Sequence, residues 1–367
     1  MREITEGRTR LLIPGAEEGK PRVFFNPRMR LNRDICVLVV KGLMRETEIS
    51  FLDLLAGTGA KGLRVAKEAG CRVILNDASE AAWEVIRENA ALNDLQVEVC
   101  NRSANLLLQE RRDFNFVDID PFGTPVPFLD NAFLALGRRG FLGVTATDTA
   151  PLCGVYPLAC MRKYWAQSMR TEFCHEMGVR ILAGYAARTA AKYGKGVRCL
   201  LSHYREHYFR VYLKVYSGRK RADESLGEMG YLYYCSRCLS RQYRKEFLPG
   251  KAVCGCGARY EVAGPMWLGD LVDKDFVLRL IEEAAAEEMG EALRTLLMIK
   301  GELDVPFYYD LHTLGRFLKV EVPPMDYVLD ELRSGGYRAS RTHYSPTAVK
   351  TDADAAALKR LLRSFSR

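Results

Sequence analysis

The sequence contains no run of about 18 consecutive apolar residues, so we expect no helix that spans a membrane. Its first residues, MREITEGRTR, contain no apolar signal segment. Without a secretion signal, the 11 cysteines are not expected to form a disulfide framework, and a reducing cytoplasm is the expected location. No internal repeat and no low-complexity tract is present. These absences favour an ordinary globular protein that does not bind a membrane.

The composition allows a well-packed protein of two or three domains. The chain has 367 residues, of which 48% are hydrophobic. The net charge of +8 is compatible with an anionic partner such as a nucleic acid, although it does not require one. No feature of the sequence points to an obligatory protein partner, so we expect a monomer.

A glycine-rich turn follows the first predicted buried strand. The strand covers residues 49–55, the turn AGTGA covers 56–60, and a helix is predicted over 61–69. Such a turn lets a ligand approach the backbone and the N-terminus of the helix. The short motif alone is also compatible with nicotinamide or flavin cofactors.

The next two predicted strands end in polar residues. The second strand, 71–75, is followed by Asp77, and an acid at this place in a doubly wound sheet binds the two hydroxyls of an adenosine ribose. Asp77 could instead cap the helix predicted through residue 91. The third strand, 96–100, precedes polar residues 101–105, which either contact an adenine or cap the helix predicted at 105–111.

The fourth strand, 114–118, leads into the turn DIDPFG at 118–123. The carboxyl end of a strand is where an open α/β sheet binds its ligands. Asp120, Pro121 and Phe122 would place a hydrogen-bond acceptor and an aromatic ring there, which suits a planar base with an exocyclic amine. The alternative is a turn acid beside a core phenylalanine.

The remaining pattern of the first region indicates the sheet type. A fifth strand is predicted at 140–146, and an antiparallel hairpin ends the region. Five alternating β/α units followed by a hairpin predict an α/β, Rossmann-like class I methyltransferase sheet rather than a dehydrogenase sheet. The predicted helices cover 125–137, 156–177 and 184–193, and the hairpin strands cover 197–204 and 207–216.

Residues 1–34 show no strong period and predict an N-terminal arm. A short extended piece is expected at 22–27, and Asp34 is expected to cap a helix over 34–45. The arm is either solvated or a lid that carries an aromatic ring and cations over the active crevice. The polar segment 217–230 predicts a linker, so the expected domains are the arm 1–34, a methyltransferase domain 35–217 and a C-terminal domain 218–367.

The C-terminal region contains two close pairs of cysteines. Cys235 and Cys238 form the first pair, and Cys254 and Cys256 form the second. Four thiolates with this spacing across a hairpin predict a tetrahedral Zn²⁺ site. Since four protein ligands leave no open coordination position, we expect the zinc to be structural.

The chain beyond residue 264 predicts a winged-helix-like order of elements. A helical pattern over 274–299 is broken near Gly290, two shorter helices are expected within 306–335, and an amphipathic helix is expected at 352–366. A basic turn follows the shorter helices and forms either a cationic wing or a solvated edge. The side chains of this wing would be Arg333, Arg338, Arg341, His343 and Lys350.

Several long segments together resemble one family, the S-adenosylmethionine-dependent tRNA guanine-26 N2-dimethyltransferases. The resemblance runs from the N-terminal arm to the C-terminal tail. The segments that carry it are FFNPRMRLNRD, DLLAGTGAKGLR, LNDAS, DIDPFGTP, TATDTAPLCG, ARTAAKYGKG, HYFRVYLKV, GPMWLGDL and SRTHYSPTAVKTDA.

The resemblance implies methyl transfer to the exocyclic N2 of a tRNA guanine, usually twice. It makes Asp120 of the DPFG turn the group that accepts the amine proton, and it places the guanine between Phe24 and Phe122. It also supports the zinc cysteines and a C-terminal domain that binds tRNA. The family usually has an acid where this chain has Ser103. The residues expected to bind the cofactor are Arg33, Asp53, Gly57, Gly59, Arg64, Asp77, Ser103 and Ala104.

Two other functions remain open from the sequence. An N6-adenine methyltransferase would also use an acid, a proline and an aromatic residue, but its motif usually reads DPP followed by an aromatic residue. A non-catalytic RNA-binding protein could use the zinc site, the basic turn and the arm without chemistry. The intact turn at Gly57 and Gly59 and the acid at Asp77 argue against a dead site.

Overall fold

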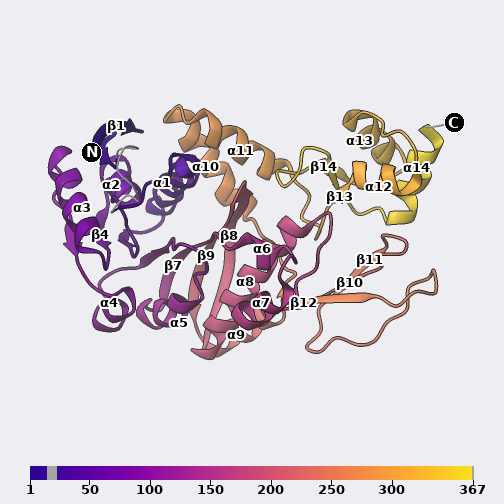
Figure 1. Cartoon of the computed structure of the whole chain (residues 1–367), viewed down its shortest axis with the longest axis horizontal. Coiled ribbons are helices and arrows are strands. Elements are labelled where there is room, and N and C mark those ends of the chain that lie inside the picture. The colour runs from indigo at the N-terminus through magenta and orange to yellow at the C-terminus, as the bar shows by residue number, and fades with distance from the viewer. Residues whose placement is uncertain (15–22, 366–367) are drawn as a thin grey trace.

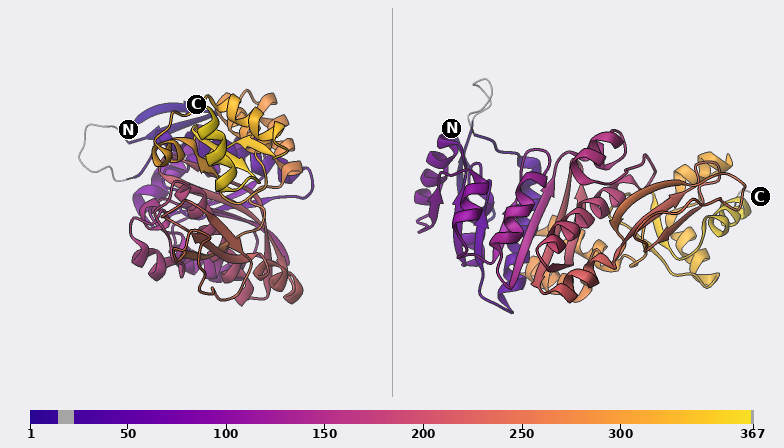
Figure 2. Two further views of the ribbon diagram at one scale, coloured as in Figure 1. Left: turned by 90° about the vertical axis from the view of Figure 1, so that its right-hand side faces the viewer. Right: turned by 90° about the horizontal axis from the view of Figure 1, so that it is seen from below.

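The computed structural model describes residues 1–14 and 23–365. Residues 15–22 of the predicted arm, which include the first residue of the predicted extended piece, lie outside the described residues, as do residues 366–367. The molecule is elongated, and the two ends of the chain lie at opposite ends of it (Figures 1 and 2).

A seven-stranded sheet forms the first half of the molecule, in the order β5-β4-β3-β6-β7-β9-β8. The strands from β5 to β7 are parallel, and β9 pairs antiparallel with both β7 and β8. This confirms the predicted methyltransferase-type sheet with a terminal hairpin. The strand bounds are β3 Ser50–Asp53, β4 Arg72–Asn76, β5 Glu98–Cys100, β6 Phe116–Ile119, β7 Arg139–Ala146, β8 Lys195–Arg205 and β9 Tyr208–Ser217.

Alternate residues of the central strands enter two hydrophobic cores, one on each face of the sheet. Leu52 and Val117 face the core formed with α4, α5 and α8. Phe51 and Phe116 face the core formed with α1, α2 and α3. The sheet is therefore covered on both sides. The helix bounds are α1 Arg30–Met44, α2 Ala60–Arg64, α3 Glu80–Leu92, α4 Ala104–Glu110, α5 Val126–Ala135, α6 Thr149–Leu152, α7 Pro157–Tyr164 and α8 Cys174–Lys192.

The N-terminal arm is more ordered than its sequence predicted. Its first residues form an antiparallel hairpin of β1 (Arg2–Glu6) and β2 (Thr9–Ile13). The prediction that Asp34 caps α1 is wrong, because a 3₁₀ turn over Pro27–Met29 brings the chain into α1 already at Arg30. Asp34 lies inside the helix and forms a buried salt bridge with Arg64.

Two boundaries in the middle of the chain differ from the prediction. The long helical region was expected to break after residue 177, but α8 is continuous from 174 to 192, and the break lies between α7 and α8. The predicted linker 217–230 contains a helix, α9 (Arg219–Leu226), which the sequence analysis did not predict. The Ser225 hydroxyl of α9 exchanges hydrogen bonds with the backbone of Val197, at 2.8 and 3.1 Å, which fixes α9 on β8.

Beyond α9, the described part of the C-terminal region is built of two small sheets and the helices α10 to α14 (Figure 1). The first sheet has the order β11-β10-β12, and α10 and α11 then return to pack against α1. The second sheet, β13-β15-β14, with its helices gives the expected winged-helix-like part. Its bounds, and those of the elements before it, are β10 Met229–Tyr234, β11 Arg241–Arg244, β12 Glu261–Trp267, α10 Lys274–Ala286, α11 Gly290–Gly301, β13 Tyr309–Asp310, α12 Leu311–Leu318, α13 Met325–Ser334, β14 Ala339–Arg341, β15 Ala348–Thr351 and α14 Ala355–Phe365.

The predicted cationic wing is only partly present. The side chains of His343 and Lys350 are buried and contact the carboxylate of Glu302, because a buried polar group requires a partner. Arg338 and Arg341 remain on the surface, where they pair with Asp352 and Asp326. A continuous free cationic edge of five residues does not form.

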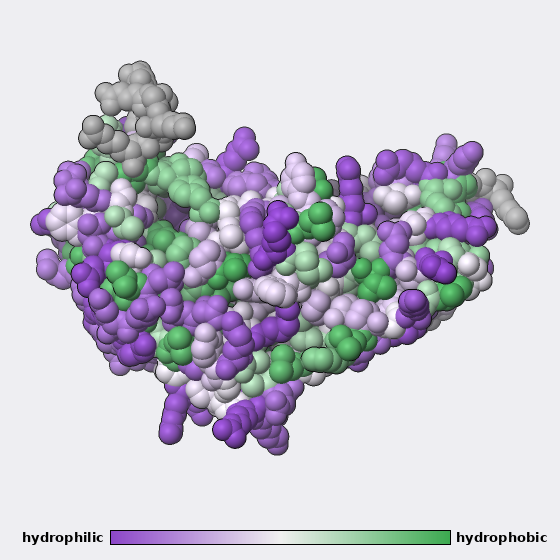
Figure 3. All heavy atoms as spheres, turned by 60° about the horizontal axis from the view of Figure 1, so that its bottom comes forward, coloured by the Kyte–Doolittle hydropathy of each residue, from purple (hydrophilic) through white to green (hydrophobic). Residues whose placement is uncertain are grey.

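Within residues 1–14 and 23–365, none of the helices has the length and apolar character needed to cross a membrane. Figure 3 shows one face of the molecule, on which apolar residues lie in small groups between hydrophilic ones.

Candidate active site

A cavity of about 700 Å³ opens at the carboxyl edge of the sheet, where β3, β4, β6 and β7 end. The N-terminal arm contributes one wall through Phe24 and Asn26, and the hairpin β8–β9 contributes His207. The cavity thus joins segments that are far apart in the sequence. The predicted site residues that line it are Phe24, Arg33, Asp53, Gly57, Asp77, Asp120, Pro121 and Phe122.

Four predicted cofactor residues do not line this cavity. Gly59 precedes α2 with a φ of 77° and allows the turn to close. Ser103 and Ala104 lie at the start of α4, where Ser103 is exposed and Ala104 is buried. Arg64 is fully buried beside the cavity wall. Direct contacts of these residues with a cofactor stay predictions.

The glycine turn and Asp77 form the part of the cavity that suits a nucleoside. Gly57 has a φ of 56°, and a Cβ atom there would lie 3.2 Å from the backbone oxygen of Phe24. Its N–H donates a hydrogen bond of 2.9 Å to Asp77 Oδ2, while Asp77 Oδ1 accepts one from the N–H of Ser79. Asp77 therefore orders the turn, whereas Ser79 caps α3 through its own hydroxyl, and each carboxylate oxygen of Asp77 retains a free lone pair for a ribose hydroxyl.

Asp120 lies in a network of charges behind the cavity. Its Oδ2 accepts a hydrogen bond of 3.0 Å from Asn32 Nδ2 and pairs closely with Lys61 Nζ. Burial raises the pKa of Asp120, but the charges of Lys61 and Arg210 outweigh it, and the pKa is lowered. Asp120 is consequently ionised at neutral pH and available as a proton acceptor.

Lys61 also binds the buried Asp118, at 2.6 Å, and Arg210 pairs with the other oxygen of Asp118. Burial lowers the pKa of Lys61, but Asp118 and Asp120 raise it by a larger amount, so the lysine stays charged. The nearby Asp53 has the opposite balance, because burial raises its pKa to about 7 in spite of Lys61. The network therefore contains a carboxyl group with a lowered pKa, Asp120, and one with a raised pKa, Asp53.

The rings of Phe24 and Phe122 meet at the mouth of the cavity. Their centroids are 4.2 Å apart, with an angle of 85° between the planes. Phe122 is 72% exposed and Phe24 is 47% exposed, which is unusual for large apolar side chains. Phe25 instead lies against the guanidinium group of Arg33. A base can stack between Phe24 and Phe122 only when this edge-to-face contact opens.

Arg33 and Arg64, which were both predicted to bind the cofactor, are joined through Glu6 of the N-terminal hairpin. Glu6 of β1 accepts two hydrogen bonds of 2.6 Å from Arg33 and one of 3.0 Å from Arg64. Arg64 also pairs with Asp34 and Glu68, so three carboxylates surround its guanidinium group. These contacts fix the arm against α1 and α2, next to the cavity.

Sequence reasoning missed several residues that shape the site. Lys61 follows the glycine turn directly, and Asn32 lies in the segment FFNPRMRLNRD, but neither position carries a motif for contact with Asp120. Thr147 directly follows β7. Its hydroxyl accepts a hydrogen bond of 2.6 Å from the N–H of Gly123 and so holds the DPFG turn.

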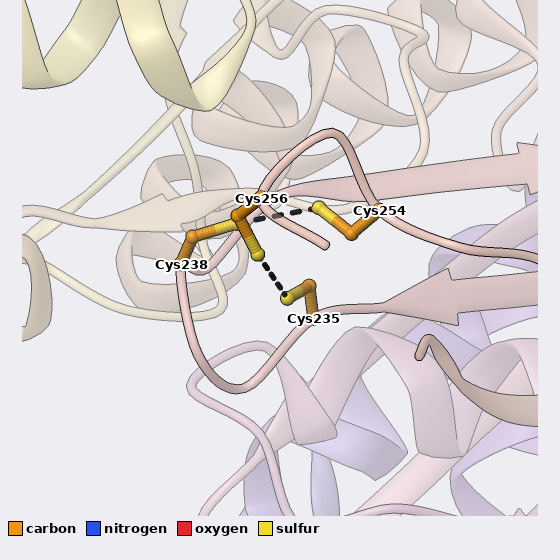
Figure 4. Close-up of side chains that lie close together, drawn as sticks. All are labelled: Cys235, Cys238, Cys254 and Cys256. Carbon is orange, nitrogen blue, oxygen red and sulfur yellow. Dashed lines mark hydrogen bonds between the residues drawn. The ribbon is translucent and has the colours of Figure 1, made fainter. Parts of the chain in front are cut away.

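The four clustered cysteines come together as predicted (Figure 4). The Sγ atoms of Cys235 and Cys256 are 3.6 Å apart, and those of Cys238 and Cys254 are 3.4 Å apart. All four lie within 4.8 Å of one another. A tetrahedral zinc ion with Zn–S bonds of 2.3 Å holds its sulfurs about 3.8 Å apart, so the geometry fits this metal.

Comparison with known proteins identifies the family. The model of the N2,N2-dimethylguanosine tRNA methyltransferase family matches residues 7–363. The tRNA (guanine(26)-N(2))-dimethyltransferase of Pyrococcus abyssi is 42% identical over 96% of this chain and 96% of its own, and that of Thermococcus kodakarensis is 44% identical over 95% and 96%. The structure of Trm1 from Pyrococcus horikoshii with S-adenosyl-L-methionine has a TM-score of 0.90, with 40% identity, and covers 98% of this chain and 99% of that chain. The chain therefore belongs to the N2,N2-dimethylguanosine tRNA methyltransferase family.

Proposed function

We propose that this protein transfers methyl groups from S-adenosylmethionine to the exocyclic N2 of guanine 26 in tRNA and forms N2,N2-dimethylguanosine. One observation supports this reaction above all. An ionised carboxylate, Asp120, lies beside two exposed aromatic rings in the same cavity as the glycine turn and Asp77. The cavity thus combines a place for a base, a proton acceptor and a place for a nucleoside cofactor.

The cofactor portion of the cavity fits S-adenosylmethionine. The close approach that Gly57 permits and the acceptor atoms of Asp77 suit an adenosine, as does the position at the edge of the sheet. When bound, the sulfonium of this cofactor supplies an electrophilic methyl group. Arg33 lines the cavity, and its Nη1 atom donates a hydrogen bond of 3.2 Å to the backbone oxygen of Asn26. We expect this guanidinium group to hold the anionic end of the cofactor.

The base is expected to leave the tRNA stack and enter between Phe24 and Phe122. Stacking on two rings offsets part of the cost of unstacking, which is a few kcal/mol. The amine of guanine is a weak nucleophile, because its lone pair is delocalised into the ring. Asp120 orients this amine and accepts its proton as the nitrogen becomes cationic.

Asn32 and Lys61 keep Asp120 in place during this step. Both contacts are made to Oδ2, so the carboxylate is held at one oxygen. A second transfer needs the same acceptor again, and the proton must leave Asp120 between the two transfers. Exchange with solvent is available because the Asp120 side chain is partly exposed, at 18%.

The four-cysteine cluster is proposed to hold a structural Zn²⁺ ion. Cys235 and Cys238 bracket the turn between β10 and β11, and Cys254 and Cys256 lie in the loop before β12. A metal there ties together a segment that has few other buried contacts. The metal would thus stabilise the C-terminal region, for which we propose the bounds 218–367. We propose that this region binds tRNA and that the protein acts in the cytoplasm.

The direct test is incubation of unmodified tRNA with the protein and S-adenosylmethionine, followed by mass analysis of the nucleosides. We expect N2,N2-dimethylguanosine, and we expect none of it when guanine 26 is replaced. The variant Asp120→Asn, which keeps the shape of the side chain, should bind tRNA and lose most of the turnover. Methyladenosine as the product, or wild-type turnover in Asp120→Asn, would refute this assignment.

A further inference from the structure

Large apolar side chains are exposed in a short segment that the proposed reaction does not use. The segment links α6 to α7 and ends just after α7. Exposed groups of this kind, when they cluster, mark binding surfaces, whereas single ones need no explanation. We call this group the 155–165 surface; it consists of Val155, Tyr156, Leu158, Met161 and Trp165.

Trp165 has the most unusual conformation of the group. Its φ of 49° and ψ of 41° are left-handed, which is rare for a bulky residue, yet its side chain is 68% exposed. The conformation is fixed by a hydrogen bond of 3.0 Å from its N–H to the backbone oxygen of Met161. Arg188 of α8 donates to the carbonyl oxygens of Tyr164 and Trp165, at 2.8 and 3.4 Å. A strained backbone that presents a ring to solvent is typical of a functional position.

The 155–165 surface is attached directly to the active site. Tyr164 and Lys163 of α7 donate hydrogen bonds of 2.6 and 2.9 Å to the carboxylate of Asp148. Asp148 follows Thr147, whose hydroxyl holds the turn that carries Phe122. The surface is therefore held in a fixed position relative to the ring that would stack on the base.

The segment that carries these side chains has only cationic charges of its own, and Asp148 and Glu172 flank it. Residues 149–171 include no Asp or Glu but three cations, Arg162, Lys163 and Arg170. Lys163 pairs with Asp148, whereas Arg162 and Arg170 form no salt bridge with any residue that the structure describes. Exposed rings between free cations suit unstacked bases and the phosphates beside them. An apolar protein partner would not require these cations.

We propose that the 155–165 surface binds the tRNA next to the nucleotide being modified, with Tyr156 and Trp165 stacking on bases and Arg162 and Arg170 contacting phosphates. This proposal rests on the proposed function, because it assigns a second contact surface to the same substrate. It explains why a tryptophan is kept exposed in a left-handed conformation beside the active site.

The test uses the full chain and unmodified tRNA transcript. Trp165→Gly removes the ring, and glycine adopts a φ of 49° without strain, so thermal stability should not fall. We expect the Kd for tRNA, measured by fluorescence anisotropy, to rise by about 5- to 150-fold, the usual range for one stacked base. Tyr156→Ala should act in the same direction. The affinity for S-adenosylmethionine and the identity of the methylated nucleoside should not change.

Leu278→Ala is the matched control, because Leu278 of α10 is also about half exposed, at 47%, but lies outside the 155–165 surface. An unchanged Kd in the double variant Tyr156→Ala/Trp165→Gly would overturn the proposal. A change in oligomeric state by light scattering, with unchanged tRNA affinity, would identify the surface as an interface between copies and overturn it as well. If the wild type formed no methylated nucleoside while its tRNA affinity still depended on Trp165, the proposed function would fail but this surface would stand.

Discussion

The contact between Phe24 and Phe122 predicts a specific departure from additivity. The two rings touch each other when no base is present, so base entry must first break this contact. The gain is two base–ring stacks of about 1–3 kcal/mol each. The loss is one edge-to-face contact between aromatic rings, which is worth about 0.5–1.5 kcal/mol.

Each single alanine variant removes one stack but also removes the cost of parting the rings. With stacks of about 2 kcal/mol and a ring contact of about 1 kcal/mol, each single variant loses about 1 kcal/mol, or about 5-fold. The double variant has no stack and no contact to break, so it loses about 3 kcal/mol, or about 150-fold. Independent sites would give only about 2 kcal/mol, or about 30-fold.

The assay is kcat/KM for unmodified tRNA, measured with saturating S-adenosylmethionine for the wild type, Phe24→Ala, Phe122→Ala and the double variant. The ratio reports lost transition-state stabilisation, which includes stacking in the bound state. Cofactor affinity by calorimetry without tRNA serves as the control. A double loss equal to or smaller than the sum of the single losses would refute the idea that the rings part around the base.

Three further outcomes are expected. In Lys61→Met the pKa of Asp120 should rise, because a nearby positive charge is lost. Since Asp120 accepts a proton only when it is ionised, the fall in activity on the acidic side should move to higher pH. Lys61→Arg should keep the pH profile of the wild type. Parallel pH profiles in both variants would contradict this role. Cys235→Ser should lower bound zinc from about one equivalent to near zero and speed proteolysis around residues 235–260, whereas a zinc-free wild type of full stability would exclude a structural metal. The affinity for tRNA should fall about a thousandfold between about 50 and 200 mM salt if about six phosphates are contacted, and a flat dependence would argue against binding through the basic surfaces.

The sheet could be predicted from the sequence because its determinants are local. Each parallel strand is a short apolar run followed by polar or glycine residues, and the two long β-rich runs are separated by a turn. The glycine turn, Asp77 and the DPFG turn could be predicted for the same reason, because all three follow the ends of strands. The clustering of the four cysteines was equally predictable from spacing alone.

The charge network could not be predicted, because its members are remote in the sequence. Lys61 is 59 residues from Asp120, and Asn32 is 88 residues from it. Glu6 gave no signal at all, although it joins Arg33 to Arg64. Its position depends on the hairpin β1–β2, whose polar sequence showed no clear strand period. The pairing of His343 and Lys350 with Glu302 was missed for the same reason.

The protonation pattern of the network follows from counting its charges. Asp53, Asp118 and Asp120 supply three carboxylates, while Lys61 and Arg210 supply two cations. One negative charge is in excess in a buried place, so one carboxyl group is expected to hold a proton near neutral pH. The raised pKa of Asp53 makes it that group, because Lys61 contacts Asp118 and Asp120 directly and Arg210 contacts Asp118. Asp120 can then remain ionised without leaving the cluster with an unbalanced charge. Asp53 lines the cavity, so a cationic cofactor bound there would favour the ionised form of this carboxyl group and would balance its charge.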